Sequence, residues 1–138
     1  MAIERTLIVI KPDGFKRHLI GKIIARLEQK NFRIMRIASH DFTKEQAQEF
    51  YSAHKEKPFF NELVSFITSG TVVACILEGY NAINTVRSMI GSTKSFEAMP
   101  GTIRGDFGLG VTDNIIHASD SYESFIKESQ VIFSNSNN

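Results

Sequence analysis

The stretch TLIVIKPDG, residues 6–14, carries the two signals from which the fold can be worked out. Its first half, TLIVI, is a short and almost continuous apolar run, of the length expected for a buried strand. Its second half contains Pro-Asp-Gly, a strong turn signal. The sequence therefore predicts a buried strand that stops abruptly, with the polar side chain of Lys11 at its end.

The segments after this strand alternate between helical and strand-like periodicity. An amphipathic helix is predicted first, because four apolar residues fall at positions i, i+3, i+4 and i+7: Ile20, Ile23, Ile24 and Leu27. Residues 32–42, FRIMRIASHDF, are rich in Ile and Phe and predict a second strand. Thr43 and Gln46 have the spacing of a capping box and predict that a helix begins there.

The second half of the chain continues the alternation. Pro58 predicts the start of a helix whose apolar face carries Phe60, Leu63, Val64 and Ile67. Residues 71–79, TVVACILEG, predict a buried strand. A helix from about Asn81 is expected next, with Ile83, Val86 and Ile90 facing inward.

The last third contains a Gly-rich segment, a short strand and a final helix. Residues 99–108, MPGTIRGDFG, contain Pro and three Gly and predict a loop. NIIH, residues 114–117, is strand-like. Asp120 with Glu123 can cap a last helix that runs through Phe133.

The element order β-α-β-α-α-β-α, loop, β-α predicts the α+β fold class. The expected architecture is a ferredoxin-like split βαβ sandwich, a four-stranded antiparallel sheet with helices packed on it. A small Rossmann-like parallel sheet is the alternative. With neither a linker nor a repeat, residues 1–138 are expected to form a single domain, with 134–138, SNSNN, as a frayed tail.

Composition narrows the possible functions. The net charge of +1, without a block of Lys or Arg, does not indicate a nucleic-acid-binding face. The single cysteine, Cys75, excludes an internal disulfide and lies in an apolar run, so a buried, inert thiol is expected. The N-terminal apolar run is too short for a signal peptide or a membrane span, and a cytoplasmic location is expected.

Four side chains other than histidine are placed where they can meet a ligand. Lys11 ends a strand, although a solvated lysine is the simpler interpretation. Arg87 lies beside inward-facing helix positions, where its stem could equally cover apolar surface. Arg104 lies between two glycines, which allow a close approach to a ligand. Phe59 precedes the inward-facing Phe60, so it is expected at the rim, where it could stack on a base.

His117 is the strongest candidate for chemistry. It ends a strand-like run just before a capped helix, and Glu128 follows eleven residues later, where it could fold back beside the ring. A carboxylate on one ring nitrogen fixes the tautomer and leaves the other nitrogen free as a nucleophile. The sequence contains no glycine-rich phosphate-binding motif and no metal-ligand spacing, so side chains would have to bind any phosphate.

Five short motifs, in register from about Glu4 to Phe133, resemble those of nucleoside diphosphate kinases. They are IKPDG at 10–14, FYSAHKEKPFF at 50–60, SGTVVA at 69–74, PGTIRGDFG at 100–108 and NIIHASDS at 114–121. The order and spacing of all five make the resemblance specific. It implies a transferase that moves the γ-phosphoryl group of a nucleoside triphosphate, typically ATP, to a nucleoside diphosphate. The implied mechanism is ping-pong through a phosphohistidine.

The resemblance also implies roles for residues of the catalytic group. His117 corresponds to the phosphorylated histidine, and Ser119 and Glu128 correspond to the residues that hydrogen-bond and orient it. Lys11, in the K-P-D motif, corresponds to a lysine that contacts the nucleotide. Tyr51, before the K-P-F-F stretch, is the fifth member of this group.

The remaining implied residues bind the nucleotide. Phe59 corresponds to the aromatic residue that stacks on the base, and Asn114 to the asparagine that contacts the sugar. Arg87 and Arg104 correspond to the arginines that clamp the phosphates, with Thr93 nearby. Stacking without reading of base edges predicts broad nucleotide specificity. The cofactor would be Mg²⁺ held by the nucleotide phosphates, without a metal site of the protein's own.

The resemblance implies a homo-oligomer, either a tetramer or a hexamer, without a membrane or a specific nucleic acid as partner. The sequence departs from the family pattern at Ala118, where glycine usually follows the active histidine. A positive φ at this position would make alanine costly and displace His117, whereas an extended backbone would make it harmless. The alternative function is therefore a weakened homologue that acts as a nucleotide-binding or interaction module.

Overall fold

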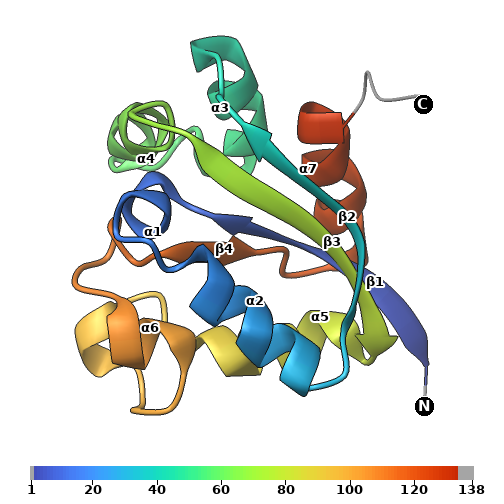
Figure 1. Ribbon diagram of the computed structural model, residues 1–138. Helices are drawn as coiled ribbons and strands as arrows, with labels where there is room; N and C mark the ends of the chain where they lie inside the picture. The colour runs from blue at the N-terminus through green and yellow to red at the C-terminus, as the bar shows by residue number, and fades with distance from the viewer. Residues whose placement is uncertain (1, 134–138) are drawn as a thin grey trace.

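One antiparallel sheet of four strands forms the centre of the computed structural model, which describes residues 2–133 (Figure 1). The strands are β1 (Ile3–Ile10), β2 (Arg33–His40), β3 (Val72–Tyr80) and β4 (Ile116–Ala118). They lie in the order β2-β3-β1-β4, and each neighbouring pair is antiparallel. The predicted ferredoxin-like α+β fold is thus confirmed, and the parallel alternative is wrong because β1 pairs with both of its neighbours in the opposite direction.

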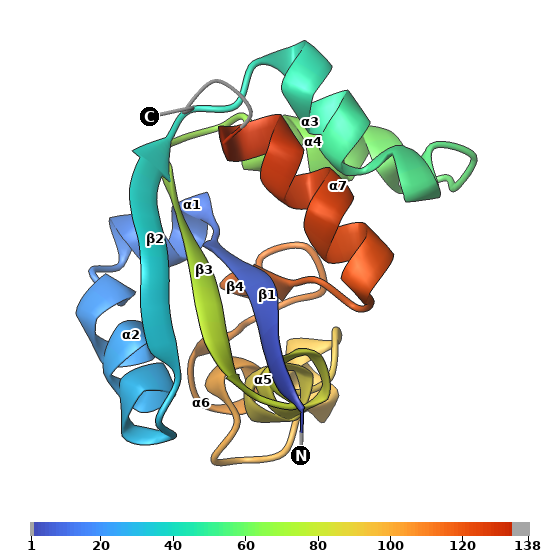
Figure 2. The same cartoon turned by 90° about the vertical axis from the view of Figure 1, so that its right-hand side faces the viewer.

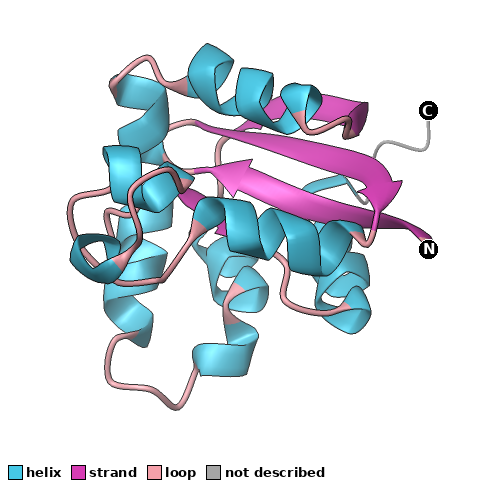
Figure 3. Ribbon diagram, turned by 90° about the horizontal axis from the view of Figure 1, so that it is seen from below, coloured by secondary structure: helices cyan, strands magenta, loops and turns pink. Residues whose placement is uncertain are grey.

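Helices cover both faces of this sheet. The α-helices are α1 (Pro12–Lys16), α2 (Ile20–Gln29), α3 (Lys44–Phe50), α4 (Phe60–Ile67), α5 (Ala82–Ile90), α6 (Ile103–Phe107) and α7 (Tyr122–Phe133), and two 3₁₀ turns are η1 (Ser52–His54) and η2 (Ser95–Glu97). Helices α3, α4 and α7 lie on one side, with α7 running across β1 (Figure 2). Helices α2, α5 and α6 lie on the other side, which faces the viewer in Figure 3.

The apolar run of β1 is continuous because both faces of the strand are buried. Ile8 and Ile10 belong to the core that β1 shares with α2 and α5, whereas Leu7 and Val9 belong to the core beneath α3, α4 and α7. Successive side chains of a strand point to opposite faces, so one run of apolar residues supplies both cores. The strand therefore lies centrally, and its end is enclosed by packed elements on both sides.

Several predicted boundaries differ from those observed. The Pro-Asp-Gly turn is the first turn of the short helix α1, in which Pro12 occupies the first turn as proline prefers. The predicted loop 99–108 contains α6, because Thr102 caps a helix by accepting from the amide of Gly105. Pro58 precedes α4, which begins at Phe60.

The capping prediction for α3 is confirmed, and the one for α7 is wrong. Thr43 and Gln46 form both hydrogen bonds of a capping box. At α7, the amide of Ser124 donates to the side chain of Ser121, and Asp120 instead accepts from the Ser124 hydroxyl. Since serine and aspartate cap equally well, the sequence did not distinguish neighbouring candidates.

Glycine at position 79 is required by the packing of an aromatic ring. A Cβ atom at Gly79 would lie 2.5 Å from Cδ1 of the buried Phe32. We expect Gly79→Ala to lower the free energy of unfolding by about 1–3 kcal/mol, because a filled core must shift its side chains or backbone to admit another carbon. Urea unfolding measures this change.

Gly21→Ala is the matched control, because within residues 2–133 no atom other than those of its chain neighbours and its own helix backbone lies within 4 Å of the corresponding Cβ position in α2. Alanine should leave stability unchanged or raise it there, since glycine is the weaker helix former. Equal effects of the two substitutions would contradict the proposed contact between Gly79 and Phe32.

Candidate active site

His117 lies on β4, directly opposite Val9 of β1. Its ring packs edge-on against Phe50, with 5.0 Å between the ring centroids, and against Tyr51 at 6.4 Å. Nε2 is 2.8 Å from Oε1 of Glu128, and within residues 2–133 Nδ1 has no hydrogen-bond partner. The histidine is thus held by one ring nitrogen while the other stays available.

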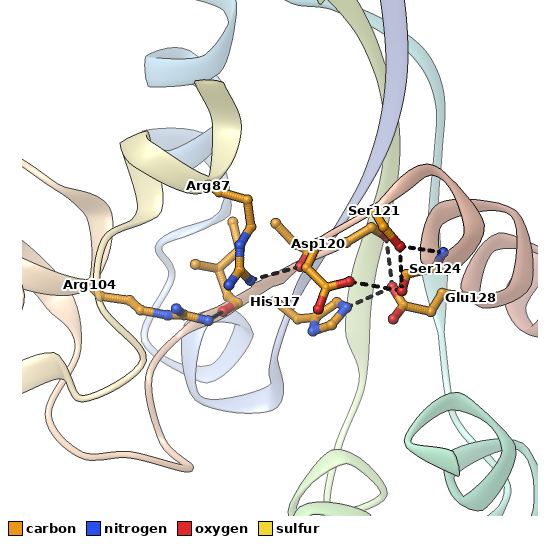
Figure 4. Close-up of polar contacts among 10 residues, drawn as sticks. Arg87, Arg104, His117, Asp120, Ser121, Ser124 and Glu128 are labelled. Carbon is orange, nitrogen blue, oxygen red and sulfur yellow. Dashed lines mark hydrogen bonds and ion pairs between the residues drawn. The ribbon is translucent and has the colours of Figure 1, made fainter. Parts of the chain in front are cut away.

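Glu128 comes from α7, so the helix after β4 folds back onto the strand as the spacing predicts. The same Oε1 atom accepts a hydrogen bond of 2.7 Å from the hydroxyl of Ser119. Figure 4 shows the His117 ring directed toward Glu128, with the capping residues Ser121 and Ser124 at the start of the same helix. A carboxylate that accepts from Nε2–H places the lone pair of the imidazole on Nδ1.

Two arginines bind the backbone carbonyls on either side of His117. Nη2 of Arg104 donates to the carbonyl of Ile116 at 2.6 Å, and Nη1 of Arg87 donates to the carbonyl of Ala118 at 3.2 Å. Both side chains reach β4 from the side away from Glu128 (Figure 4). Although Arg87 and Arg104 are 17 positions apart in the sequence, the packing of α5 and α6 brings their guanidinium groups to one strand.

Arg104 and Lys11 are buried near the more exposed Arg87, and burial lowers the pKa values of both buried cations. Burial and the nearby Arg87 lower the pKa of Arg104 to about 10. Burial and the Arg104 charge lower the pKa of Lys11 to about 8, although Asp13 and Asp113 partly offset this shift. A cluster of positive charges, two of them buried, that disfavour one another is an environment in which a polyanion is stabilised.

Lys11 is joined to the segment before β4. Its ammonium group donates to Oδ1 of Asn114 at 2.8 Å and to the carbonyl of Thr112 at 3.1 Å. The side-chain Nδ2 group of Asn114 in turn donates to the backbone carbonyl of Thr93, at 2.9 Å. The structure therefore brings together Lys11, Asn114 and Thr93, three residues that the resemblance assigns to the nucleotide.

Tyr51 and Phe59 lie in the segment around η1. Tyr51 is buried beside His117, and burial together with the charge of Glu128 raises the pKa of its hydroxyl. Phe59 is 42% exposed, as expected for a rim position, whereas Phe60 packs against the core. The Phe59 ring lies 5.7 Å from the ring of His54, so an aromatic surface faces outward next to the site.

Sequence and structure comparisons agree with this arrangement. The sequence model of the family described as Nucleoside diphosphate kinase matches residues 4–138. The chain is 54% identical to a nucleoside diphosphate kinase of Hyperthermus butylicus, over 97% of this chain and 94% of that protein. The chain belongs to the nucleoside diphosphate kinase family.

Solved structures of family members have the same fold. The nucleoside diphosphate kinase of Aquifex aeolicus superposes with a TM-score of 0.91 at 47% identity, over 94% of each chain. That of Halobacterium salinarum, solved in complex with CDP, superposes with a TM-score of 0.93 at 42% identity, over 98% of this chain and 90% of that one. The predicted activity, phosphoryl transfer from a nucleoside triphosphate to a nucleoside diphosphate, is confirmed by this membership. The chain is a nucleotide-binding phosphotransferase.

Ala118 does not disturb the site. It lies within β4, pairs with Ile8 across the sheet, and is not among the residues with positive φ. An extended backbone accepts alanine without strain. Its methyl group is fully buried in the core that includes Ile8, so alanine here contributes packing that glycine would not.

Two residues of the site, Ile115 and Asp13, are not indicated by the sequence. Ile115 has a φ of 77°, in the left-handed region, where a β-branched residue costs about 1–3 kcal/mol. Its amide donates to Oδ2 of Asp13 at 3.0 Å. The sequence offered Asp13 only as a turn residue, and no pattern of apolar residues indicates a left-handed isoleucine.

Within residues 2–133 there is no helix with the length and apolar character that crossing a membrane requires.

The buried ammonium group of Lys11 predicts a pH effect on stability. The pKa of Lys11 is about 8 in the folded protein, below its ordinary value of 10.5. Between these values the unfolded chain binds one more proton, so Lys11 makes the free energy of unfolding rise with pH. We therefore expect the stability of the wild type relative to Lys11→Met to rise by on the order of 2–3 kcal/mol from about pH 7 to about pH 10.

Urea unfolding of both proteins at matched pH values measures this difference. The comparison cancels the opposite contributions of Tyr51 and Cys75, whose pKa values are raised by burial. A difference that does not change with pH would contradict the low pKa of Lys11.

Proposed function

We propose that His117 is the nucleophile of the phosphoryl transfer and that Nδ1 is the attacking atom. The Nδ1 lone pair would form a bond to the γ-phosphorus while the bond from that phosphorus to the β,γ-bridging oxygen breaks, with its electrons leaving on the nucleoside diphosphate. A second nucleoside diphosphate then takes the phosphoryl group from the phosphohistidine, which completes a ping-pong cycle. The hydrogen bond between Nε2 and Glu128 supports this choice of nitrogen.

Glu128 and Ser119 are proposed to orient the ring. As a positive charge develops on the phosphorylated imidazole, the Glu128 carboxylate would stabilise it through the Nε2–H group. Ser119 donates to the same carboxylate oxygen and would keep it in place. Tyr51, whose ring packs edge-on against the His117 ring, would restrict its motion.

The positive cluster beside His117 is the observation that carries the proposal. Arg87, Arg104 and Lys11 would neutralise the charge of the phosphate oxygens, which is the main contribution an enzyme can make to phosphoryl transfer. Guanidinium groups suit this role because their paired N–H groups match two oxygens of one phosphate. The carbonyl oxygens that the arginines now contact are neutral acceptors that an anion can replace.

Phe59, Asn114 and Thr93 are proposed to bind the rest of the nucleotide. The exposed ring of Phe59 would stack on the base, which any purine or pyrimidine allows. Asn114 would contact the sugar, and Thr93 would lie beside the phosphates. Because stacking does not read base edges, the substrates would include ribo- and deoxynucleotides of all bases.

Mg²⁺ is proposed to arrive with the nucleotide. Within residues 2–133, no three His, Cys, Asp or Glu side chains gather into a group that could hold a metal ion. Phosphate oxygens and water are the ligands this ion prefers, and when bound with the nucleotide it would neutralise part of the phosphate charge. The role of the chain's own residues is to bind the phosphates that carry the ion.

We further propose that residues 1–138 act as one domain in a cytoplasmic homo-oligomer, a tetramer or a hexamer. Exposed apolar side chains on the edge strand β2 and in the segment around α6 support self-association: Ile37, Phe96, Met99 and Leu109. The predicted frayed tail, residues 134–138, lies outside the described residues. The alternative of a weakened binding module depended on strain at Ala118, and the extended backbone there removes its basis.

Incubation with γ-labelled ATP tests the nucleophile. The wild type should yield a phosphoprotein whose label is stable to base but not to acid, and should pass the label to an added nucleoside diphosphate. His117→Ala should carry no label, because the attacking nitrogen is gone. The control His18→Asn changes an exposed histidine with positive φ and should label normally. Undiminished labelling of His117→Ala would overturn the assignment.

Steady-state kinetics of Phe59→Ala test the stacking role. Loss of the ring should raise KM for all nucleotides by a similar factor, corresponding to about 1–3 kcal/mol of binding free energy. The kcat value should change little, because the ring does not touch the reacting atoms. A rise in KM confined to one base would show that the site reads base edges.

A further inference from the structure

We propose that Asp13 is a positioning residue for His117, because its carboxylate holds the strained backbone from which β4 begins. The inference deepens the proposed function and rests on His117 as the nucleophile. Within residues 2–133 the Asp13 carboxylate accepts no hydrogen bond from β4 or from the proposed phosphate-binding side chains, so its effect on His117 would pass through the amide of Ile115.

The backbone at Ile115 is a tight γ-turn. The amide of Ile116 donates to the carbonyl of Asn114 at 2.9 Å, and Ile115 between them has a φ of 77°. This kind of turn is rare, and a β-branched residue adopts its left-handed conformation only where the surroundings impose it. Groups outside the turn must therefore hold Ile115 in place.

The segment 11–13 binds both the backbone amide and the backbone carbonyl of Ile115. Its amide donates to Oδ2 of Asp13 at 3.0 Å, and its carbonyl accepts from the amide of Lys11 at 2.8 Å. Gly14 allows the close approach, since a Cβ atom there would meet Ile10 at 2.7 Å and Ile115 at 3.3 Å. The side chain of Ile115 is fully buried, so the residue is fixed from three directions.

His117 follows Ile115 by two residues. Ile116 is the first residue of β4, and its carbonyl accepts from Arg104. On the other side of the turn, Asn114 binds the ammonium group of Lys11. Relaxation of Ile115 to an extended conformation would redirect the chain on both sides, and so would move the nucleophile relative to the cations that face it.

Burial of the Asp13 carboxylate costs free energy, which argues that this side chain does more than begin α1. Its Oδ1 atom is buried and has no hydrogen-bond partner within residues 2–133. Burial raises the pKa of this carboxyl group. The charge also lies near Lys11, so an effect of Asp13 through the Lys11 charge is the competing explanation.

Two substitutions distinguish the role of Asp13 as a hydrogen-bond acceptor from the role of its negative charge. Asp13→Asn keeps an oxygen that can accept from the Ile115 amide but removes the charge beside Lys11. Asp13→Glu keeps the charge but displaces the acceptor by one methylene. If Asp13 positions His117, Asp13→Glu should lower kcat by about 10- to 100-fold with little change in KM, since a misplacement of about 1 Å can cost that much. Asp13→Asn should restore kcat to near the wild-type value.

A double mutant tests whether the effect passes through Ile115. Glycine adopts a positive φ without strain, so Ile115→Gly should make the carboxylate less necessary. We expect Asp13→Glu to lower kcat much less in the Ile115→Gly background than in the wild type. Asn31→Gly is the matched control: it places glycine at another position with a positive φ, 71° in the turn after α2, and it should not reduce the effect of Asp13→Glu.

Each variant is first checked for a folded circular dichroism spectrum and then measured by steady-state kinetics and by labelling with γ-labelled ATP. Loss of kcat in Asp13→Asn but not in Asp13→Glu would overturn the inference in favour of the Lys11 charge. An equal effect of Asp13→Glu in both backgrounds would also overturn it. If the wild type carries label on His117, such results refute only the role of Asp13; absence of that label from the wild type would refute the proposed function as well.

Discussion

The contact between the end of β1 and the start of β4 is the constraint on which the site depends. Residues 11–14 and 112–115 are about a hundred positions apart, yet hydrogen bonds from Lys11 and to Asp13 join them. This junction places the histidine strand beside the central strand and gives Lys11 its partners. It also enforces the left-handed conformation of Ile115, since a buried amide that lost its acceptor would be costly. The same contacts therefore hold β4 at the edge of the sheet and assemble the site.

The second constraint is electrostatic. The fold buries Lys11 and Arg104 near Arg87, although burial and mutual repulsion both disfavour their charges. The hydrogen bonds from the arginines to the carbonyls of β4 use one Nη group of each guanidinium and leave its charge unneutralised, and Nε of Arg104 is buried without a hydrogen-bond partner within residues 2–133. Such an arrangement is stabilised when a polyanion arrives, which is the property a nucleotide-binding phosphotransferase needs. The carboxylate of Glu128 is kept on the far side of the His117 ring, where it does not compete with a phosphate for the arginines.

Much of the fold follows from local patterns that the structure confirms. The apolar run before Lys11, the helical spacing from Ile20 to Leu27 and the capping box at Thr43 each specify an element through short-range physics. The prediction was wrong where the local signal admitted two outcomes. Thr102 turns a Gly-rich segment into the helix α6, and Ser121 rather than Asp120 caps α7. In both cases the competing choices differ by a single hydrogen bond, which a sequence pattern does not weigh.

The sequence by itself determined the strand and helix types, the residue types available for chemistry and, through its motifs, the kinase family. His117, Lys11, Arg87 and Arg104 could each be named because they stand at element ends or between glycines. Only the tertiary structure decided that Nε2 is the ring nitrogen bound to Glu128, that the arginines flank the histidine, and that Ala118 is harmless. It alone revealed the strained Ile115 and its acceptor on Asp13. The reason is physical: a left-handed isoleucine is unfavourable locally and exists only because groups remote in sequence hold it, so no local pattern records it.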